Sequence, residues 1–157
     1  MNALSPLLAV EDVLLDVQVT DKTALLRTVG ARLAQRHAID AADVIDALLA
    51  REQLGSTAIG HGVAVPHARI RRLAAAVAAY ARPHAPIPFD APDGKPVGHV
   101  VVLLVPALAA DQHLRLLATI AEHLSDAGCR RGLADCATAA AARALLVAER
   151  EPGENEG

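Results

Sequence analysis

A glycine-rich stretch leads into a short apolar run near the middle of the chain. Residues 55–67 have the sequence Gly55-Ser56-Thr57-Ala58-Ile59-Gly60-His61-Gly62-Val63-Ala64-Val65-Pro66-His67. Three glycines within the first eight of these residues indicate a loop. The Val-Ala-Val run predicts a buried strand, which Pro66 ends because proline cannot donate to a strand ladder. We therefore expect His67 at the end of a strand, where side chains are displayed on a rigid support.

A strand and two helices are predicted before this stretch. Residues 13–19 alternate loosely between apolar and polar side chains, which is typical of a strand. Asp21 precedes an apolar stripe at helical spacing and is expected to cap a first helix. Asp40 opens a second helical pattern that runs to about residue 54, and Gly55 stands where a left-handed C-terminal cap is expected.

The second half of the chain adds a central strand and further helices. Residues 73–82 are rich in alanine, which favours a helix, but their length and the following Pro83 also permit a strand. A loop is expected over residues 84–96, and residues 97–105, apolar on both faces, predict the central strand. Three helical segments follow, one capped by Asp111 and two at residues 130–135 and 138–149.

These patterns predict one α/β domain with α-helices before and after a small β-sheet. The domain is expected to span residues 4–149, and residues 150–157 are expected to form a flexible C-terminal tail. A chain of 157 residues buries about 70% of its unfolded surface, which is enough for one sizeable core. Because the sequence is 53% hydrophobic and only 1% aromatic, Ala, Val, Leu and Ile must fill that core.

The composition excludes several classes of protein. A net charge of -3 with 21% charged residues fits neither a disordered acidic chain nor a strongly basic nucleic-acid binder. The longest apolar run, residues 100–110, is far shorter than the about 20 residues that a membrane-spanning helix needs. No secretory signal is visible, and Cys129 and Cys136 form no C-x-x-C pair. We expect a cytoplasmic protein that neither binds nucleic acid nor inserts into a membrane.

Seven histidines stand out in this aliphatic sequence. His67 is largely neutral at pH 7 if its pKa is near the ordinary 6.5, which would make it a usable nucleophile; a packed strand-end histidine is the alternative. His113 falls in the first turn after the Asp111 cap, where free N–H groups attract anions; a surface helix residue is the alternative. His61 is a candidate neighbour of the site. Four others are expected to have structural roles only: His37, His84, His99 and His123.

Metal chemistry and a basic patch are the other possibilities that the sequence raises. No third histidine converges on His61 and His67, and no H-E-x-x-H motif occurs, so no metal site is predicted. Arg69, Arg71 and Arg72 form a basic cluster directly after His67. This cluster is either a solvated turn or a patch that docks an acidic partner or binds a phosphate.

The longest motif closely resembles the active-site signature of one bacterial family. Residues 49–69 contain an R-E-x-L-G-S-T element and a G-V-A-V-P-H element, as in the fructose/mannitol-type IIA components of the phosphoenolpyruvate:sugar phosphotransferase system (PTS). Residues 88–97, 102–106 and 111–117 are similar to that family's loop, central strand and following helix. The resemblance covers residues 4–149, essentially the whole domain, and implies that family's single-domain α/β fold, a small mixed β-sheet flanked by α-helices.

The resemblance implies a function for particular residues. His67 would be the phosphoacceptor, modified at Nε2, and Arg51 would stabilise the charge of the transferred phosphoryl group. His113 resembles the second active-site histidine, which donates to a phosphoryl oxygen. Ser56 and Thr57 are expected to offer donors to the same group. No metal or other cofactor is implied, because the phosphoryl group arrives on a protein.

Two positions depart from the family pattern. Ala58 stands where the family usually has glycine, and if that position needed a positive φ the alanine would cost about 1 kcal/mol. His61 stands where a small polar residue is more typical.

The family has two branches, and the resemblance favours the nitrogen-regulatory one. A free-standing domain suits a phosphocarrier that takes its phosphoryl group from an HPr-like carrier of the nitrogen type (NPr type) and regulates target proteins according to its phosphorylation state. The alternative is a stand-alone fructose/mannitol-type sugar component that passes phosphate to a IIB domain. A binding module that has lost transfer and a metal-dependent hydrolase are the rival classes.

Overall fold

The structure is a computed structural model that describes residues 1–108 and 110–149, with the side chains of residues 110–112 left out of the description. These residues contain a single mixed sheet of six strands: β1 (Val13–Val17), β2 (Ala58–Gly60), β3 (Val63–Ala64), β4 (His67–Ile70), β5 (Val77–Pro83) and β6 (His99–Pro106). The strand order is β1-β5-β6-β3-β2, and β4 pairs with β6 beyond the end of β3. β5 is antiparallel to β6, whereas β3 and β4 are parallel to it. The predicted α/β fold with a small mixed sheet is confirmed.

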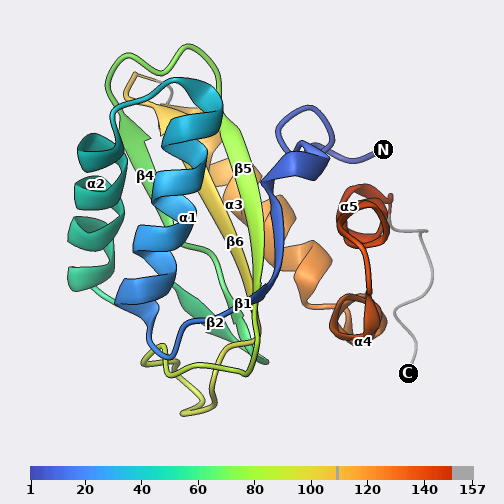
Figure 1. The fold of residues 1–157 in the computed structure, drawn as a ribbon. Coiled ribbons are helices and arrows are strands. Elements are labelled where there is room, and N and C mark those ends of the chain that lie inside the picture. The colour runs from blue at the N-terminus through green and yellow to red at the C-terminus, as the bar shows by residue number, and fades with distance from the viewer. Residues whose placement is uncertain (109, 150–157) are drawn as a thin grey trace.

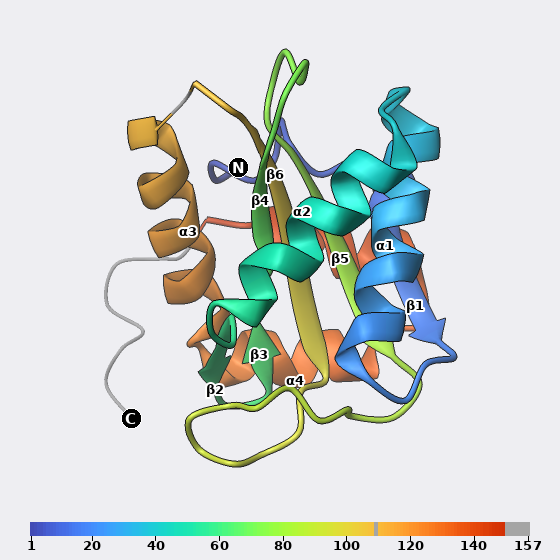
Figure 2. The same cartoon turned by 90° about the vertical axis from the view of Figure 1, so that its left-hand side faces the viewer.

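Helices cover both faces of the sheet (Figures 1 and 2). α1 (Lys22–His37) and α2 (Ala41–Gln53) lie on one face, and α3 (Ala110–Leu124), α4 (Ala127–Asp135) and α5 (Ala139–Val147) lie on the other. None of these helices, over the residues described, has the length and apolar character needed to cross a membrane.

β6 is the central strand, as the apolar run predicts. Its side chains are buried from His99 to Val105. Successive strand residues point to opposite faces, so β6 divides the core in two. One set packs toward α1 and α2 (Val100, Val102 and Leu104), and the other toward α3, α4 and α5 (Val101, Leu103 and Val105). Each such buried side chain stabilises the fold by about 1.5–3 kcal/mol of transfer free energy.

The predicted helix starts at Asp21 and Asp40 are confirmed. The Asp21 carboxylate accepts a hydrogen bond from the Ala24 N–H at 2.8 Å, which satisfies one free donor of α1. The Asp40 carboxylate accepts from the Asp43 N–H at 3.1 Å and does the same for α2.

The predicted left-handed cap at Gly55 is wrong. Leu54 keeps right-handed helical angles, and Gly55 has a φ of 156°, which is closer to extended backbone than to the left-handed helix. The Gly55 N–H donates to the Glu52 carbonyl at 3.2 Å, so a tight turn ends α2 instead. At the other predicted cap, α3 begins at Ala110, one residue before Asp111, whose side chain lies outside the described residues.

The ambiguous alanine-rich segment forms strand β5. β5 lies between β1 and β6 and pairs with both. Hydrogen bonds to two neighbouring strands outweigh the helix propensity of alanine, which is a weak preference. The last two helices are displaced from their predicted bounds, with α4 starting at Ala127 and α5 ending at Val147. The flexible tail predicted for residues 150–157 lies outside the described residues.

Three histidines expected to have structural roles make hydrogen bonds inside the fold. His37 Nε2 lies 2.8 Å from a carboxylate oxygen of Asp12, which is fully buried in the 3-10 helix η1 (Val10–Asp12). His123 Nε2 lies 2.7 Å from the Leu145 carbonyl oxygen and links α3 to α5. His99 Nδ1 lies 2.8 Å from the Tyr80 hydroxyl in a buried pair between β6 and β5.

Candidate functional site

His67 is the first residue of β4, not the end of the preceding strand as the sequence predicted. β3 pairs with the start of β6, the ladder is interrupted at Pro66, and pairing resumes when His67 lies opposite Leu103. The Pro66 carbonyl accepts from the Leu103 N–H at 2.9 Å. Proline therefore interrupts the strand without turning the chain away from the sheet, because its carbonyl can still accept a hydrogen bond.

His67 lies on the α3 face of the sheet, at its edge. Ala68 and Ile70 are buried in the core under α1 and α2, so His67, which alternates with them, points to the opposite face. Figure 2 shows β4 beside β6, between α2 and α3. Among the described strands β4 pairs with β6 alone, so no described strand pairs with its outer edge.

Two hydrogen bonds fix the state of the His67 ring. Nδ1 lies 2.9 Å from the Val65 carbonyl oxygen, which can only accept, so Nδ1 carries the proton. Nε2 accepts from the Arg51 Nε–H at 3.3 Å and therefore presents its lone pair. Burial holds the pKa of His67 below its ordinary value, and the Arg51 charge acts in the same direction. The ring is a neutral imidazole with Nε2 as its available nucleophilic atom.

Arg51 reaches His67 from the other side of the sheet. It lies in the last turn of α2, which covers the opposite face from α3. Its Nη1 donates to the Gly55 carbonyl at 2.9 Å, which fixes the guanidinium at the start of the glycine-rich segment. The remaining guanidinium donors are suited to phosphate oxygens.

His113, on α3, lies next to the His67 ring. The two ring centroids are 5.0 Å apart and the rings are nearly perpendicular, at 72°. The His113 side chain is buried, and its Nε2 has no hydrogen-bond partner among the described residues. Burial lowers the pKa of His113, and the nearby His67, Arg69 and Arg51 lower it further. A buried nitrogen without a partner is costly, and a phosphoryl oxygen on His67 would supply the partner.

Ser56 and Thr57 use their side chains to hold the loop together. The Ser56 hydroxyl donates to the Phe89 carbonyl and accepts from the Ala58 N–H. Both Thr57 donors go to Glu52, the N–H at 3.1 Å and the hydroxyl at 2.7 Å. These donors are thus engaged inside the protein, and the predicted phosphate contacts of Ser56 and Thr57 stay a prediction.

Glu52, the neighbour of Arg51 in the sequence, has its side chain inside the fold. Its carboxylate is buried and also accepts from Lys22 Nζ at 3.3 Å. Lys22 Nζ lies 2.8 Å from Asp90 as well, which joins α1, α2 and the loop before β6. Glu52 therefore braces the segment that follows Arg51. The only signal in the sequence was its position next to that arginine.

The two departures from the family pattern have local explanations. Ala58 belongs to β2 and does not have a positive φ, so the strain considered for an alanine there is absent. His61 and Gly62 have φ values of 56° and 76° and form the turn between β2 and β3. The His61 N–H donates to Asp93 at 3.0 Å and its side chain is exposed. The contacts of His61 thus belong to the turn and to Asp93, not to the His67 ring.

Over the residues that the structure describes, no group of three or more His, Cys, Asp or Glu side chains is placed to hold a metal ion. The reactive groups gathered here are two imidazoles and a guanidinium. Such a set suits a transferred anion, because it combines one nucleophile with positive charge and N–H donors.

Comparison with known proteins identifies the family. Residues 6–148 match the family described as phosphoenolpyruvate-dependent sugar phosphotransferase system, EIIA 2. The chain belongs to this EIIA family. A nitrogen regulatory protein of Pseudomonas aeruginosa is 43% identical over 108 residues, 69% of this chain and 70% of that protein. One of Bradyrhizobium diazoefficiens is 38% identical over 123 residues, 78% of this chain and 80% of that protein.

A solved structure agrees with these relatives. The crystal structure of nitrogen regulatory protein IIA-Ntr from Neisseria meningitidis superposes on this EIIA domain with a TM-score of 0.85 at 39% identity, covering 90% of this chain and 97% of that one. The resemblance to the EIIA family, and to its nitrogen-regulatory members in particular, is therefore confirmed. Members of this family are components of a phosphotransferase system, which agrees with a site built around an available imidazole nitrogen.

Proposed function

We propose that this EIIA protein is a phosphocarrier of a phosphoenolpyruvate-dependent nitrogen phosphotransferase system. His67 accepts a phosphoryl group from an HPr-like carrier of the nitrogen type, and the protein regulates its targets in the cytoplasm according to its phosphorylation state. The observation that carries this proposal is the setting of His67: its Nε2 is a neutral nucleophile 3.3 Å from Arg51 Nε, and its ring centroid lies 5.0 Å from that of His113, whose Nε2 has no hydrogen-bond partner among the described residues.

The transfer step follows from the state of the ring. The Nε2 lone pair of His67 forms the new N–P bond, while the bond to the donor imidazole breaks and its electron pair returns to the donor nitrogen. Nδ1 keeps its proton on the Val65 carbonyl throughout. No proton has to leave His67 before attack, since its lowered pKa keeps Nε2 free at neutral pH.

The neighbouring groups stabilise the charge of the transferred phosphoryl group. Phosphoryl transfer depends mainly on positioning and on stabilising charge on the equatorial oxygens. Arg51 donates to Nε2 before transfer and can move that donation to an oxygen afterwards, since the oxygens are carried on the phosphorus that Nε2 has bonded. His113, as the Nε2–H tautomer, donates to a second oxygen. Ser56 and Thr57 contribute by holding the glycine-rich segment in place, and the Ser56 backbone is part of that segment.

The experiment is phosphorylation of the purified protein by phosphoenolpyruvate and the upstream enzymes of a nitrogen-type relay, with labelled phosphate. We expect acid-labile label on the wild type and on His61→Ala, whose exposed histidine lies in the neighbouring turn, and none on His67→Ala. Label that persists on His67→Ala contradicts the proposed phosphoacceptor, and absence of label on the wild type contradicts the proposed relay.

The regulatory branch is tested separately from transfer. The nitrogen regulatory relatives at 38% and 43% identity support this branch over sugar transport. We expect a deletion strain to take up fructose and mannitol normally and to show altered nitrogen responses. A defect confined to sugar uptake, together with transfer of label to a IIB domain, would instead assign the sugar-transport role.

A further inference from the structure

Arg69 is placed on the strand in a way that its sequence context does not reveal. It is the third residue of β4, and the exposure pattern of that strand alternates: Ala68 and Ile70 are buried, whereas His67 and Arg69 are not. Side chains two residues apart on a strand share a face and lie about 6.6 Å apart along it. Arg69 therefore stands next to His67 on the α3 face of the sheet.

The register of the sheet gives the same result independently. His67 lies opposite Leu103 and Arg69 opposite Val105. Leu103 and Val105 both belong to the core on the α3 side, and the Leu104 between them belongs to the core under α1 and α2. His113, on α3, is on this same side, and the charge of Arg69 is one of those that lower the pKa of His113.

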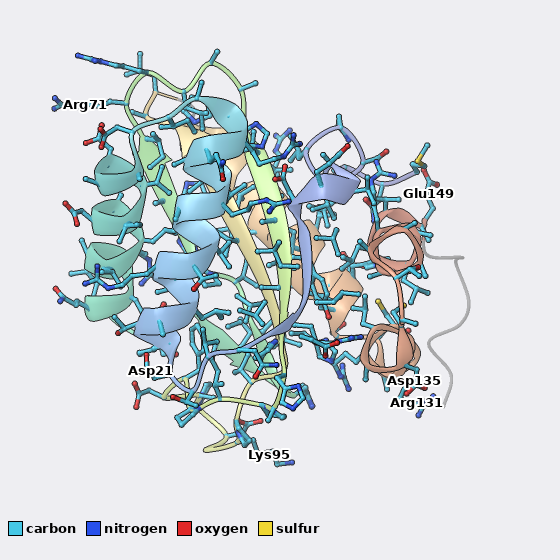
Figure 3. The ribbon with its side chains drawn as sticks, viewed as in Figure 1. Asp21, Arg71, Lys95, Arg131, Asp135 and Glu149 are labelled. Carbon is cyan, nitrogen blue, oxygen red and sulfur yellow. The ribbon has the colours of Figure 1, made fainter. Side chains whose placement is uncertain are left out.

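Arg69 is exposed, and it makes no ion pair with any side chain that the structure describes. Arg71 and Arg72, its companions in the basic cluster, lie elsewhere. Both line a cavity at the junction of α1 and α2, together with Asp40 and Asp43. Figure 3 shows Arg71 at the outer rim of the molecule, with its guanidinium pointing away from the fold. The cluster thus divides, and only its first member faces the site.

We propose that Arg69 is a further catalytic residue, which contacts the phosphoryl group on the side of His67 that Arg51 and His113 leave open. This inference rests on the proposed function, because it concerns the same group in transfer. Arg51 approaches from the α2 side, His113 from α3, and Arg69 from along the strand. Three cationic or N–H donor groups then match the three equatorial oxygens of the phosphoryl group.

A small phosphodonor separates contact with the phosphoryl group from docking of a carrier protein. Phosphoramidate carries the same N–P bond as phosphohistidine: its N–P bond breaks, its nitrogen leaves as ammonia with the protons it carries, and His67 Nε2 takes the phosphoryl group. Wild type, Arg69→Gln, Arg69→Lys and the matched control Arg71→Gln are labelled with phosphoramidate and, in parallel, with the HPr-like carrier, and kcat and KM are measured.

We expect Arg69→Gln to lower kcat about tenfold or more with both donors, Arg69→Lys to recover part of the loss, and Arg71→Gln to stay within about twofold of the wild type. The NMR titration of His113 should also shift to higher pH in Arg69→Gln and not in Arg71→Gln, since a nearby positive charge has been removed.

Equal phosphoramidate rates for the wild type and Arg69→Gln overturn the proposal. A change confined to KM for the carrier overturns it as well, because it assigns Arg69 to docking. A wild type that the carrier does not label contradicts the proposed relay, and the phosphoramidate rates still decide the role of Arg69.

Discussion

The buried pair of Tyr80 and His99 makes stability depend on pH in a way that can be measured. Burial lowers the pKa of His99 from 6.5 to about 4, and the positive charges of Arg130 and Arg82 add to the effect. In the unfolded chain the same histidine has its ordinary pKa near 6.5. Below pH 6.5 the His99 side chain is therefore protonated in the unfolded state, whereas in the folded state it stays neutral until about pH 4. The free energy of unfolding falls as the pH falls through this range.

The size of this effect follows from the two pKa values. Between pH 7 and pH 5 the unfolded state gains about 2 kcal/mol of proton-binding free energy from His99 alone, and the loss reaches about 3 kcal/mol near pH 4. At pH 7 and above the contribution is close to zero, because His99 is neutral in both states. His67 and His113 also have lowered pKa values and act in the same direction.

The comparison that isolates His99 is with His99→Gln, whose side-chain oxygen can still accept a hydrogen bond from Tyr80. Urea unfolding at pH 7 and pH 5 is followed by circular dichroism and by the fluorescence of Tyr80, which is the single tyrosine in a chain without tryptophan. We expect the wild type to lose about 2 kcal/mol more than the variant over this interval, since every other group is common to both. Equal losses in the two proteins would refute the reasoning.

Three further predictions concern the site and its surroundings. Glu52→Gln should lower the free energy of unfolding by about 2–3 kcal/mol, because the buried carboxylate accepts hydrogen bonds from Thr57 and Lys22. The control Gln53→Ala, at the exposed neighbour, should change it by less than about 0.5 kcal/mol in the same urea assay. His113→Leu should raise the free energy of unfolding by about 1 kcal/mol, because it removes a buried nitrogen that has no partner in the described structure. It should also slow phosphoryl transfer by about 100-fold. A variant that is both less stable and fully active contradicts the role proposed for His113. His61→Asn should raise the free energy of unfolding by about 0.5 kcal/mol, since Asn-Gly suits a turn in which both residues have positive φ. Calorimetry checks this gain in stability, and the labelling assay should show unchanged incorporation of label.

Much of the fold was predictable because local signals are strong where the chain begins an element. Asp21 and Asp40 mark the starts of their helices, and the apolar run of β6 predicts a central strand. β5 could not be decided from its own residues, because pairing with β1 and β6 determines its conformation. The same limit explains His67: Pro66 does end a ladder locally, but only the position of β6 shows that the strand resumes one residue later.

The candidate site divides in the same way. Arg51, His67 and His113 were named from a motif, and the structure brings them together around one ring. The bracing role of Glu52 depends on Lys22, which lies 30 residues away in the sequence, so no local pattern reveals it. Ser56 and Thr57 were expected to offer hydroxyl or backbone donors to the phosphoryl group, which stays a prediction; their hydroxyls donate to Phe89 and Glu52, partners that only the folded chain supplies.

No described strand pairs with the outer edge of β4, the strand that carries His67. Under the proposed function, the protein that delivers the phosphoryl group and the one that responds to it would both have to reach this one ring. Delivery and response would then belong to separate encounters, and the rate of phosphohistidine hydrolysis would set how long the molecule keeps a record of the last donor it met.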